Sequence, residues 1–353
     1  MVQKDSTKGI EAMVAQMPRL LRTLGRVYMA GTKALLEDFG AEGEKMVRQW
    51  IRRFGTWRGQ ELRKGHMALG LPINMESIMR YWDNSSTFYL TEEWDETGSW
   101  SPCEVKVPVK QGECYIYEPW AEADFWLWGD VYCDEVHQHT VQAYHPDAVV
   151  VIPQRLGKRD SRCTFKWVMP PNAAKQVDPI KPYPGQDVLK DWQSGTREQA
   201  GICSLRRTIR ITAAMVHFLW EVIREFRPKE VESEFGRIMD RMAADRGSAL
   251  KKERERQGWG SGPEDLFLNF DMPYTFSWEV GKKGIPSGVE IEISYCPMAE
   301  TWDWLGSLKV MKPYCEHCYS GIASKYDPSL RAGISRCKTG GDSTCLIRIA
   351  KTS

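Results

Sequence analysis

The chain has 353 residues, of which 42% are hydrophobic and 27% charged, and its formal net charge is +1. This composition is typical of a globular protein, without the basic excess of a nucleic-acid-binding protein or an acidic tail. The longest apolar stretch, residues 211–223, is too short to span a bilayer, and the N-terminus has no apolar signal core. We therefore expect a cytoplasmic protein that binds neither nucleic acid nor a membrane. Homo-oligomerisation is compatible with the sequence.

The first half of the chain begins with apolar residues at helical spacing and then changes to period-two alternation. We expect helices over residues 10–39, 44–54, 58–69 and 75–82. Strands are expected over residues 86–94, 103–109, 113–117, 148–153 and 162–169, with helices over 121–128 and 131–144 and a turn at 157–160.

The second half repeats this order after a proline-rich linker. Helices are expected over residues 204–226, 229–246 and 248–257, a short helix near 266–271, and strands over 275–280, 289–295, 333–337 and 344–350 around a helical middle. Helices followed by an antiparallel sheet, twice over, predict an α+β fold of two tandem copies packed as a pseudo-dimer. We place the first copy at residues 1–170, the linker at 171–200 and the second copy at 201–353.

The two copies are related residue by residue, which indicates an internal duplication. At an offset of 182, nine positions of the second copy match the first: Cys296, Glu300, Trp302, Tyr314, Cys315, Tyr326, Pro328, Asp342 and Cys345 fall on Cys114, Glu118, Trp120, Tyr132, Cys133, Tyr144, Pro146, Asp160 and Cys163. Upstream the offset is 188, and there Arg58 matches Arg246 and Asp83 matches Asp271. The change of offset puts six extra residues in the first copy, near residues 92–100, in a polar hairpin loop.

The repeated cysteines are the candidate chemical groups. Cys296 precedes Pro297, a natural first helical position, so its thiol is expected at a helix N-terminus, where the macrodipole and unpaired amides lower a thiol pKa. Glu300 follows one turn later and could transfer protons. Since Cys114 has no proline after it, we expect Cys296 to be the more reactive of the two.

Three interpretations of these thiols compete. One is a nucleophile or proton-transfer residue at Cys296 or Cys315. Another is a zinc site built on Cys315 and Cys318 with His317 or a further thiol, although the sequence supplies no second ligand pair at regular spacing, so we predict no stoichiometric zinc. The third is buried packing, since unpaired cysteine is among the most buried residue types; from the residues alone it ranks first for any single cysteine. Cys103, Cys203 and Cys337 lack cysteine counterparts and are interpreted as structural.

The 15 tryptophans allow two interpretations as well. They are large core residues, or an aromatic wall around a flat ligand, and core packing ranks first. The tryptophans that cluster in the sequence are Trp120, Trp126, Trp128, Trp302 and Trp304.

With Cys296-Pro-Met-Ala-Glu300, Cys315 and the closing Gly-Gly-Asp342-Ser-Thr-Cys345, the second copy resembles the L-2-amino-thiazoline-4-carboxylic acid hydrolase family. Its last strand also looks like the end of a 4-vinyl-reductase-type small-molecule-binding domain. The first resemblance implies a hydrolase that opens a C–N bond of a small cyclic, amidine- or amide-like compound. The second implies a module that binds or senses a small molecule without catalysis, with zinc as an option; the lack of an output motif counts against a sensor.

The expected site follows from the hydrolase resemblance. Cys296 would be nucleophile or proton donor and Glu300 the general acid or base, while Cys315, Asp342 and Cys345 would line the catalytic pocket. The expected binding residues are Cys114, Glu118, Cys133, Asp160, Cys163 and Trp302. The expected partner is a small-molecule substrate, and no cofactor and no metal is expected.

Overall fold

The computed structural model describes residues 6–83, 99–172, 197–274 and 276–352. The strand expected over 86–94, most of the inserted loop near 92–100 and most of the proline-rich linker lie outside the described residues. No helix within the described ranges is long and apolar enough to cross a membrane; the cytoplasmic location stays a prediction.

The first long helix, α1, runs over Ser6–Ala68 and joins the three helices expected there. It is kinked at Gly40, whose φ of 54° and ψ of −125° suit a glycine, so the stop expected at this position is a bend within one helical run. The short helix α2, Met75–Arg80, is capped by Asn74, whose Oδ1 accepts the Ser77 amide at 2.7 Å.

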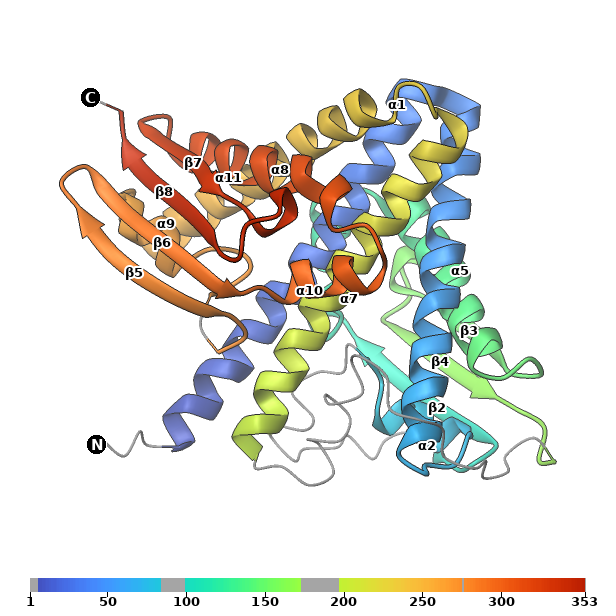
Figure 1. The fold of residues 1–353 in the computed structure, drawn as a ribbon. Coiled ribbons are helices and arrows are strands. Elements are labelled where there is room, and N and C mark those ends of the chain that lie inside the picture. The colour runs from blue at the N-terminus through green and yellow to red at the C-terminus, as the bar shows by residue number, and fades with distance from the viewer. Residues whose placement is uncertain (1–5, 84–98, 173–196, 275, 353) are drawn as a thin grey trace. The chain divides into compact units, whose positions relative to one another are not determined.

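The first sheet is antiparallel, with strand order β1-β2-β4-β3 (Figure 1). Its strands are β1 Ser99–Trp100, β2 Glu104–Lys110, β3 Val149–Gln154 and β4 Arg162–Val168. Helices α4 Glu118–Glu122 and α5 Trp126–Tyr144 lie between β2 and β3 in the chain. The strand expected over 113–117 is instead a turn leading into α4, because Pro119 favours a helix start; the helix expected over 121–128 is interrupted at Asp124, which has a φ of 52°.

The second half builds a sheet of the same order, β5-β6-β8-β7 (Figure 1). Its helices are α7 Arg197–Phe226, α8 Val231–Gln257, α9 Pro263–Leu268, α10 Pro297–Trp304 and α11 Lys312–Tyr326. Its strands are β5 Glu279–Ile285, β6 Gly288–Tyr295, β7 Leu330–Arg336 and β8 Cys345–Lys351. The two helices expected at 229–257 form the single helix α8, and β5 starts later than the strand expected over 275–280. The α+β class and the two antiparallel sheets are confirmed.

By contacts, the chain forms two compact units that share helices. Unit 1 comprises residues 1–25 and 47–211, and unit 2 comprises residues 26–46 and 212–353. The bend of α1 at Gly40 therefore belongs to unit 2, and the start of α7 belongs to unit 1. The packing of the copies as a pseudo-dimer and the domain boundaries drawn along the sequence stay predictions.

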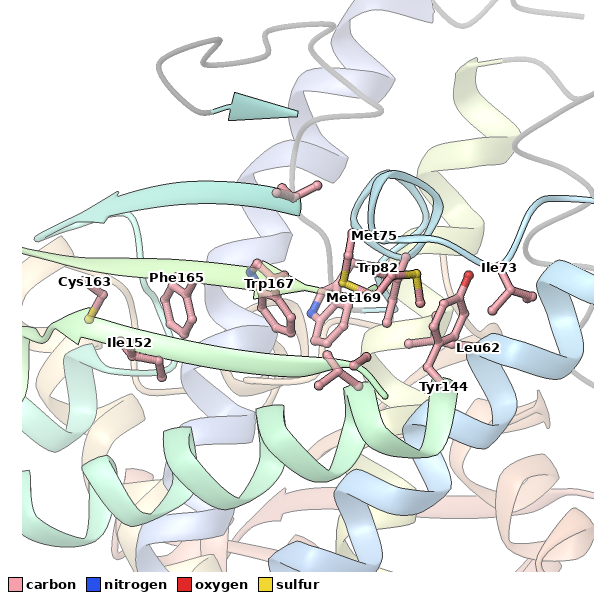
Figure 2. Close-up of a cluster of buried hydrophobic side chains, with 14 of the residues drawn as sticks. Leu62, Ile73, Met75, Trp82, Tyr144, Ile152, Cys163, Phe165, Trp167 and Met169 are labelled. Carbon is pink, nitrogen blue, oxygen red and sulfur yellow. The ribbon is translucent and has the colours of Figure 1, made fainter. Parts of the chain in front are cut away.

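The core of unit 1 fills the space between its sheet, α2 and the end of α5. Cys163, Phe165 and Trp167 follow one another along β4 toward Tyr144 (Figure 2). They occupy alternate positions of one strand, so they lie on one face of the sheet. Phe165 stacks with Trp167 at a centroid distance of 6.0 Å, and burial of these large rings supplies much of the hydrophobic stabilisation of this unit.

Matched positions make matched contacts inside the two units. Each unit has a buried, bidentate ion pair: the Nε atom of Arg58 lies 2.8 Å from Asp83, and that of Arg246 lies 2.6 Å from Asp271. Each also has a buried tryptophan whose indole N–H donates at 2.9 Å to a helix carbonyl. These pairs are Trp120 with Gly25 and Trp302 with Ala213. The repeated sequence framework thus builds the same internal supports twice.

Candidate functional site

Four thiols of unit 2 meet at the turn between β7 and β8. Arg336 and Leu346 are paired across these strands, so the next positions, Cys337 and Cys345, face each other at the turn. Helix α11 packs against β7 and brings Cys315 to them, and Cys296 sits at the start of α10. The structure thus brings together three of the expected cysteines and adds Cys337.

Cys337 is the centre of this thiol cluster, which we define as Cys296, Cys315, Cys337 and Cys345. Its sulfur makes hydrogen bonds with the thiols of Cys315 and Cys345 and lies 3.0 Å from the hydroxyl oxygen of Thr339. These donors stabilise a thiolate, so the pKa of Cys337 is lowered despite its burial. The pKa values of Cys315 and Cys345 are raised, because each shares its proton with Cys337 and is buried. Of the four thiols in the cluster, Cys337 is therefore the one whose surroundings favour the thiolate form.

Sequence reasoning missed Cys337 because its counterpart in the first copy is Arg155 and not a cysteine. A pattern that could have found it was present. Strands expected over 333–337 and 344–350 place Cys337 and Cys345 at the two ends of one hairpin turn, where cross-strand side chains come close. A search limited to repeated cysteines excludes the one thiol of the cluster that differs between the copies.

Two backbone amides, those of Cys337 and Lys338, make the hydrogen bonds that hold the turn that carries Cys337. The carboxylate of Asp342 accepts the Cys337 amide at 2.7 Å, and the Lys338 amide points at the Cys345 sulfur at 3.3 Å. Gly341 adopts a φ of 102°, which a side chain would oppose. Asp342, expected to line the pocket, is an exposed residue whose carboxylate fixes the backbone of Cys337.

Cys296 lies where the sequence predicted, but its thiol behaves differently. It is the N-cap of α10, and its sulfur accepts the Ala299 amide at 3.4 Å. The expectation of a lowered pKa is wrong, because burial outweighs the amide bonds and raises the pKa of Cys296 to about 12. Cys296 is therefore a neutral thiol near pH 7.

Glu300 and Trp302 face other partners. The carboxylate of Glu300 accepts a hydrogen bond from the Tyr295 hydroxyl at 2.8 Å. Trp302 is buried, with its indole N–H donating to the Ala213 carbonyl and its ring edge-on to Tyr314 at an interplanar angle of 69°. Both contacts hold α10 in place, and Cys296 of the thiol cluster is the N-cap of this helix.

Aromatic rings lie beside the thiols. Tyr319, one turn after Cys315, stacks on Phe270 with centroids 5.6 Å apart, and Phe270 stacks in turn on Tyr274 at 5.3 Å. Burial raises the pKa of both the Tyr274 and the Tyr319 hydroxyl. The stack lies close enough to the thiol cluster for both tyrosine hydroxyls to interact electrostatically with Cys296, and for that of Tyr319 to interact with Cys315 as well.

The candidate zinc ligands do not converge. Cys318 is buried against Arg246, which points Nη1 at its sulfur at 3.5 Å, whereas Cys315 faces Cys337. His317 bonds to the Asp240 carboxylate at 2.6 Å, outside the thiol cluster. Within the described residues, no group of three or more histidine, cysteine or acidic side chains has the arrangement of a metal site. The expected lack of stoichiometric zinc stays a prediction.

The matching place in unit 1 holds three thiols and a guanidinium. Burial raises the pKa values of Cys114, Cys133 and Cys163, that of Cys114 to about 12. Arg155 stands where unit 2 has Cys337 and is paired with Asp134. The turn itself is the same: the Asp160 carboxylate accepts the Arg155 amide at 2.7 Å and the Leu156 amide points at Cys163 at 3.3 Å.

Glu118 makes an ion pair with Arg22 inside unit 1. Like Asp160 and Trp120, it thus has a contact within its own unit that supports the local fold. The binding role expected for these first-copy residues stays a prediction.

Comparison with known proteins gives one match. Residues 207–349 match the family model described as L-2-amino-thiazoline-4-carboxylic acid hydrolase. The matched range contains all four residues of the thiol cluster. No curated protein and no solved structure matches the chain.

Proposed function

The second copy belongs to the L-2-amino-thiazoline-4-carboxylic acid hydrolase family, and from this premise we propose that unit 2 is a cysteine hydrolase that opens a C–N bond of a small cyclic amidine or amide. The observation that carries the proposal is the thiol cluster, in which Cys315, Cys345 and Thr339 lie next to Cys337 and lower its pKa. A thiolate is the nucleophilic form of cysteine, and its attack divides a difficult hydrolysis into two easier steps.

In the first step, the Cys337 sulfur attacks the amidine or amide carbon of the ring and forms a C–S bond. The C–N bond then breaks, and the ring nitrogen leaves with a proton from the thiol of Cys315, the half-buried neighbour of Cys337. The product of this step is an open-chain thioimidate or thioester on Cys337, next to a thiolate on Cys315.

In the second step, the Cys315 thiolate takes a proton from water as the water oxygen attacks the same carbon. The C–S bond breaks, and the electron pair returns to Cys337 as the thiolate. Cys345 keeps its hydrogen bond to Cys337 and favours this return. Over both steps one water molecule is added and both cysteines regain their starting states.

The other expected residues act through these two. Asp342 is a positioning residue that holds the Cys337 backbone, and Glu300 positions Tyr295, which precedes Cys296. Cys296, as a neutral thiol, would line the pocket rather than attack. A small ring fits this burial best, because Cys337 and Cys345 are buried and their neighbours Cys296 and Cys315 are half-buried.

Turnover of a cyclic amidine by the purified full chain tests the proposal. We expect L-2-amino-thiazoline-4-carboxylate, or another compound of a small panel of cyclic amidines and amides, to gain the mass of one water. Cys337→Ala should lower kcat by at least about 100-fold, since it removes the nucleophile. The matched control is Cys103→Ser, a half-buried thiol of unit 1 outside the thiol cluster. Full turnover by Cys337→Ala would contradict the proposal.

A further inference from the structure

The thiol cluster contains more thiols than the proposed hydrolysis requires. A single thiolate with one proton donor would complete the proposed cycle, yet Cys337 makes hydrogen bonds with two thiols. The second, Cys345, has no step of its own. Its position on the neighbouring strand points to a different reaction of the same nucleophile.

The register of β7 and β8 brings Cys337 and Cys345 next to each other. They follow the paired residues Arg336 and Leu346 on antiparallel neighbours, so they stand opposite each other across β7 and β8. Opposite residues in such a pair have Cα atoms about 4.5 to 5.5 Å apart, within the range that a disulfide spans. The Cys345 side chain points toward Cys337, because its sulfur lies 3.3 Å from the amide nitrogen of Lys338, the residue after Cys337. Closing the bond therefore needs little backbone movement.

The geometry points to Cys337 and Cys345 as a peroxide-sensitive thiol pair whose disulfide switches the site off. The Cys337 thiolate attacks a peroxide oxygen, the O–O bond breaks, and the sulfur becomes sulfenic acid while the peroxide is reduced to water or an alcohol. The Cys345 thiol then attacks this sulfur, the S–S bond forms, and the sulfenic oxygen leaves as water. The peroxide supplies the two oxidising equivalents, and a dithiol such as dithiothreitol returns both cysteines to thiols.

Unit 1 provides an internal comparison. Its turn has the same two contacts, from the aspartate carboxylate to a backbone amide and from the next amide to a cysteine sulfur. Cys163 matches Cys345, but Arg155 occupies the position of Cys337. A guanidinium cannot form a disulfide, and desolvation raises the pKa values of Cys114 and Cys163. Oxidation should therefore be confined to unit 2.

The proposal rests on the same thiolate as the proposed hydrolase but is tested without a turnover assay. Reduced full-length protein, with its ten cysteines as thiols, is treated with a small excess of hydrogen peroxide and its remaining thiols are alkylated. We expect two thiols to be lost, a peptide pair linked through Cys337 and Cys345 in the mass spectrum, and full return after dithiothreitol. Cys103→Ser, the control, should form the same link.

Three variants sharpen the result. Cys345→Ser should leave Cys337 as a sulfenic acid that dimedone traps, and Cys337→Ser should lose less than about a tenth as much thiol in the same time. Arg155→Cys should add a second link, to Cys163, because the turn of unit 1 has the same shape. Circular dichroism confirms that each variant is folded.

The thiol pair is disproved if the wild-type protein keeps all ten thiols under these conditions, or if the link joins Cys337 to Cys315 or two chains. Disulfide formation in a protein that hydrolyses none of the ring compounds would contradict the hydrolase alone. Turnover that peroxide leaves unchanged, with all thiols intact, would contradict the thiol pair alone.

Discussion

Units 1 and 2 build the same turn from the same framework, and a single position gives it opposite charge. In unit 2, neighbouring thiols and the Thr339 hydroxyl lower the pKa of Cys337, which favours a thiolate; in unit 1, Arg155 carries a guanidinium paired with Asp134. Both units have an aspartate carboxylate that accepts a backbone amide of the turn, and a second amide that points at a cysteine sulfur. Both also have a buried arginine, Arg58 or Arg246. The shape of the site is thus supported separately from its chemistry, and one substitution can change the chemistry without rebuilding the fold.

The largest expected effect concerns the buried arginines. Replacing Arg246 with methionine leaves Asp271 buried without a partner charge, and we expect a loss of about 3–5 kcal/mol in the free energy of unfolding of unit 2. Arg58→Met should cost less in unit 1. Arg246 also donates to the Tyr314 hydroxyl at 2.9 Å, whereas Nη1 of Arg58 has no hydrogen-bond partner within the described ranges.

Hydrogen exchange with mass spectrometry, resolved by peptide, measures the stability of each unit. The control is Lys64→Met, which removes the exposed pair with Glu61 and should change stability by less than about 1 kcal/mol. A smaller loss in the free energy of unfolding for Arg246→Met than for Arg58→Met would contradict the prediction. It would show that the hydrogen bond to Tyr314 does not make the Arg246 ion pair the more stabilising one.

The next effect is the difference in thiol reactivity between the units. At pH 7, iodoacetamide should label Cys337 at least about 100-fold faster than Cys114, because a thiolate reacts and a neutral thiol does not. The rate for Cys114, whose pKa is about 12, should rise about tenfold for each pH unit up to that value, while the rate for Cys337 stays flat above pH 6.

Cys296 should follow Cys114, since its pKa is also about 12. The measurement is peptide mass spectrometry after timed labelling. Faster labelling of Cys296 than of Cys337 would contradict this prediction and would identify Cys296, at the N-terminus of α10, as the more reactive thiol.

A third effect separates the units by pH. His66 of unit 1 is fully buried, and burial and then the charge of Arg207 lower its pKa from 6.5 to about 3. Between these values the unfolded chain binds a proton that the folded unit does not. The contribution of neutral His66 to the free energy of unfolding of unit 1 is therefore fully present above pH 6.5. It falls by about 1.4 kcal/mol per pH unit as the pH drops toward 3.

In unit 2 the matched residue is Arg254, which stays charged and donates to the Tyr326 carbonyl at 2.9 Å. We expect unit 1 to lose protection from hydrogen exchange before unit 2 when the pH falls from 7 to 5, after correction for intrinsic exchange rates. His66→Gln should remove most of this difference. An unchanged difference in that variant would assign the acid sensitivity to another group.

The smallest expected effect concerns the two tryptophan anchors. Trp120→Phe and Trp302→Phe each keep most of the buried ring but remove a hydrogen bond to a helix carbonyl, so each should cost about 1 kcal/mol in its own unit. Because the two bonds have the same length, the two losses should agree within about 0.5 kcal/mol. Urea unfolding curves of the two variants provide the measurement, and a loss in only one of them would show that the supports are not equivalent.

Local patterns in the sequence were sufficient for the repeat, the α+β class and most strands of the sheets. Alternating Val105, Val107 and Val109 predicted β2, and the matched cysteines and aspartates predicted two equivalent turns. These features depend on periodicity and on residue type, which a sequence records directly. The strand expected over 113–117 was wrong because Pro119 and the turn before it start a helix there.

The tertiary structure alone decided where the charge lies. The helix-start pattern at Cys296 and Pro297 correctly predicted an N-cap, but the pKa of that thiol depends on how deeply it is buried. The lowered pKa of Cys337 depends on donors from α11 and β8, which lie near it only after the sheet and helix have packed. Desolvation and hydrogen bonding are properties of the surroundings in space, so spacing along the chain could locate the thiols but not select the nucleophile.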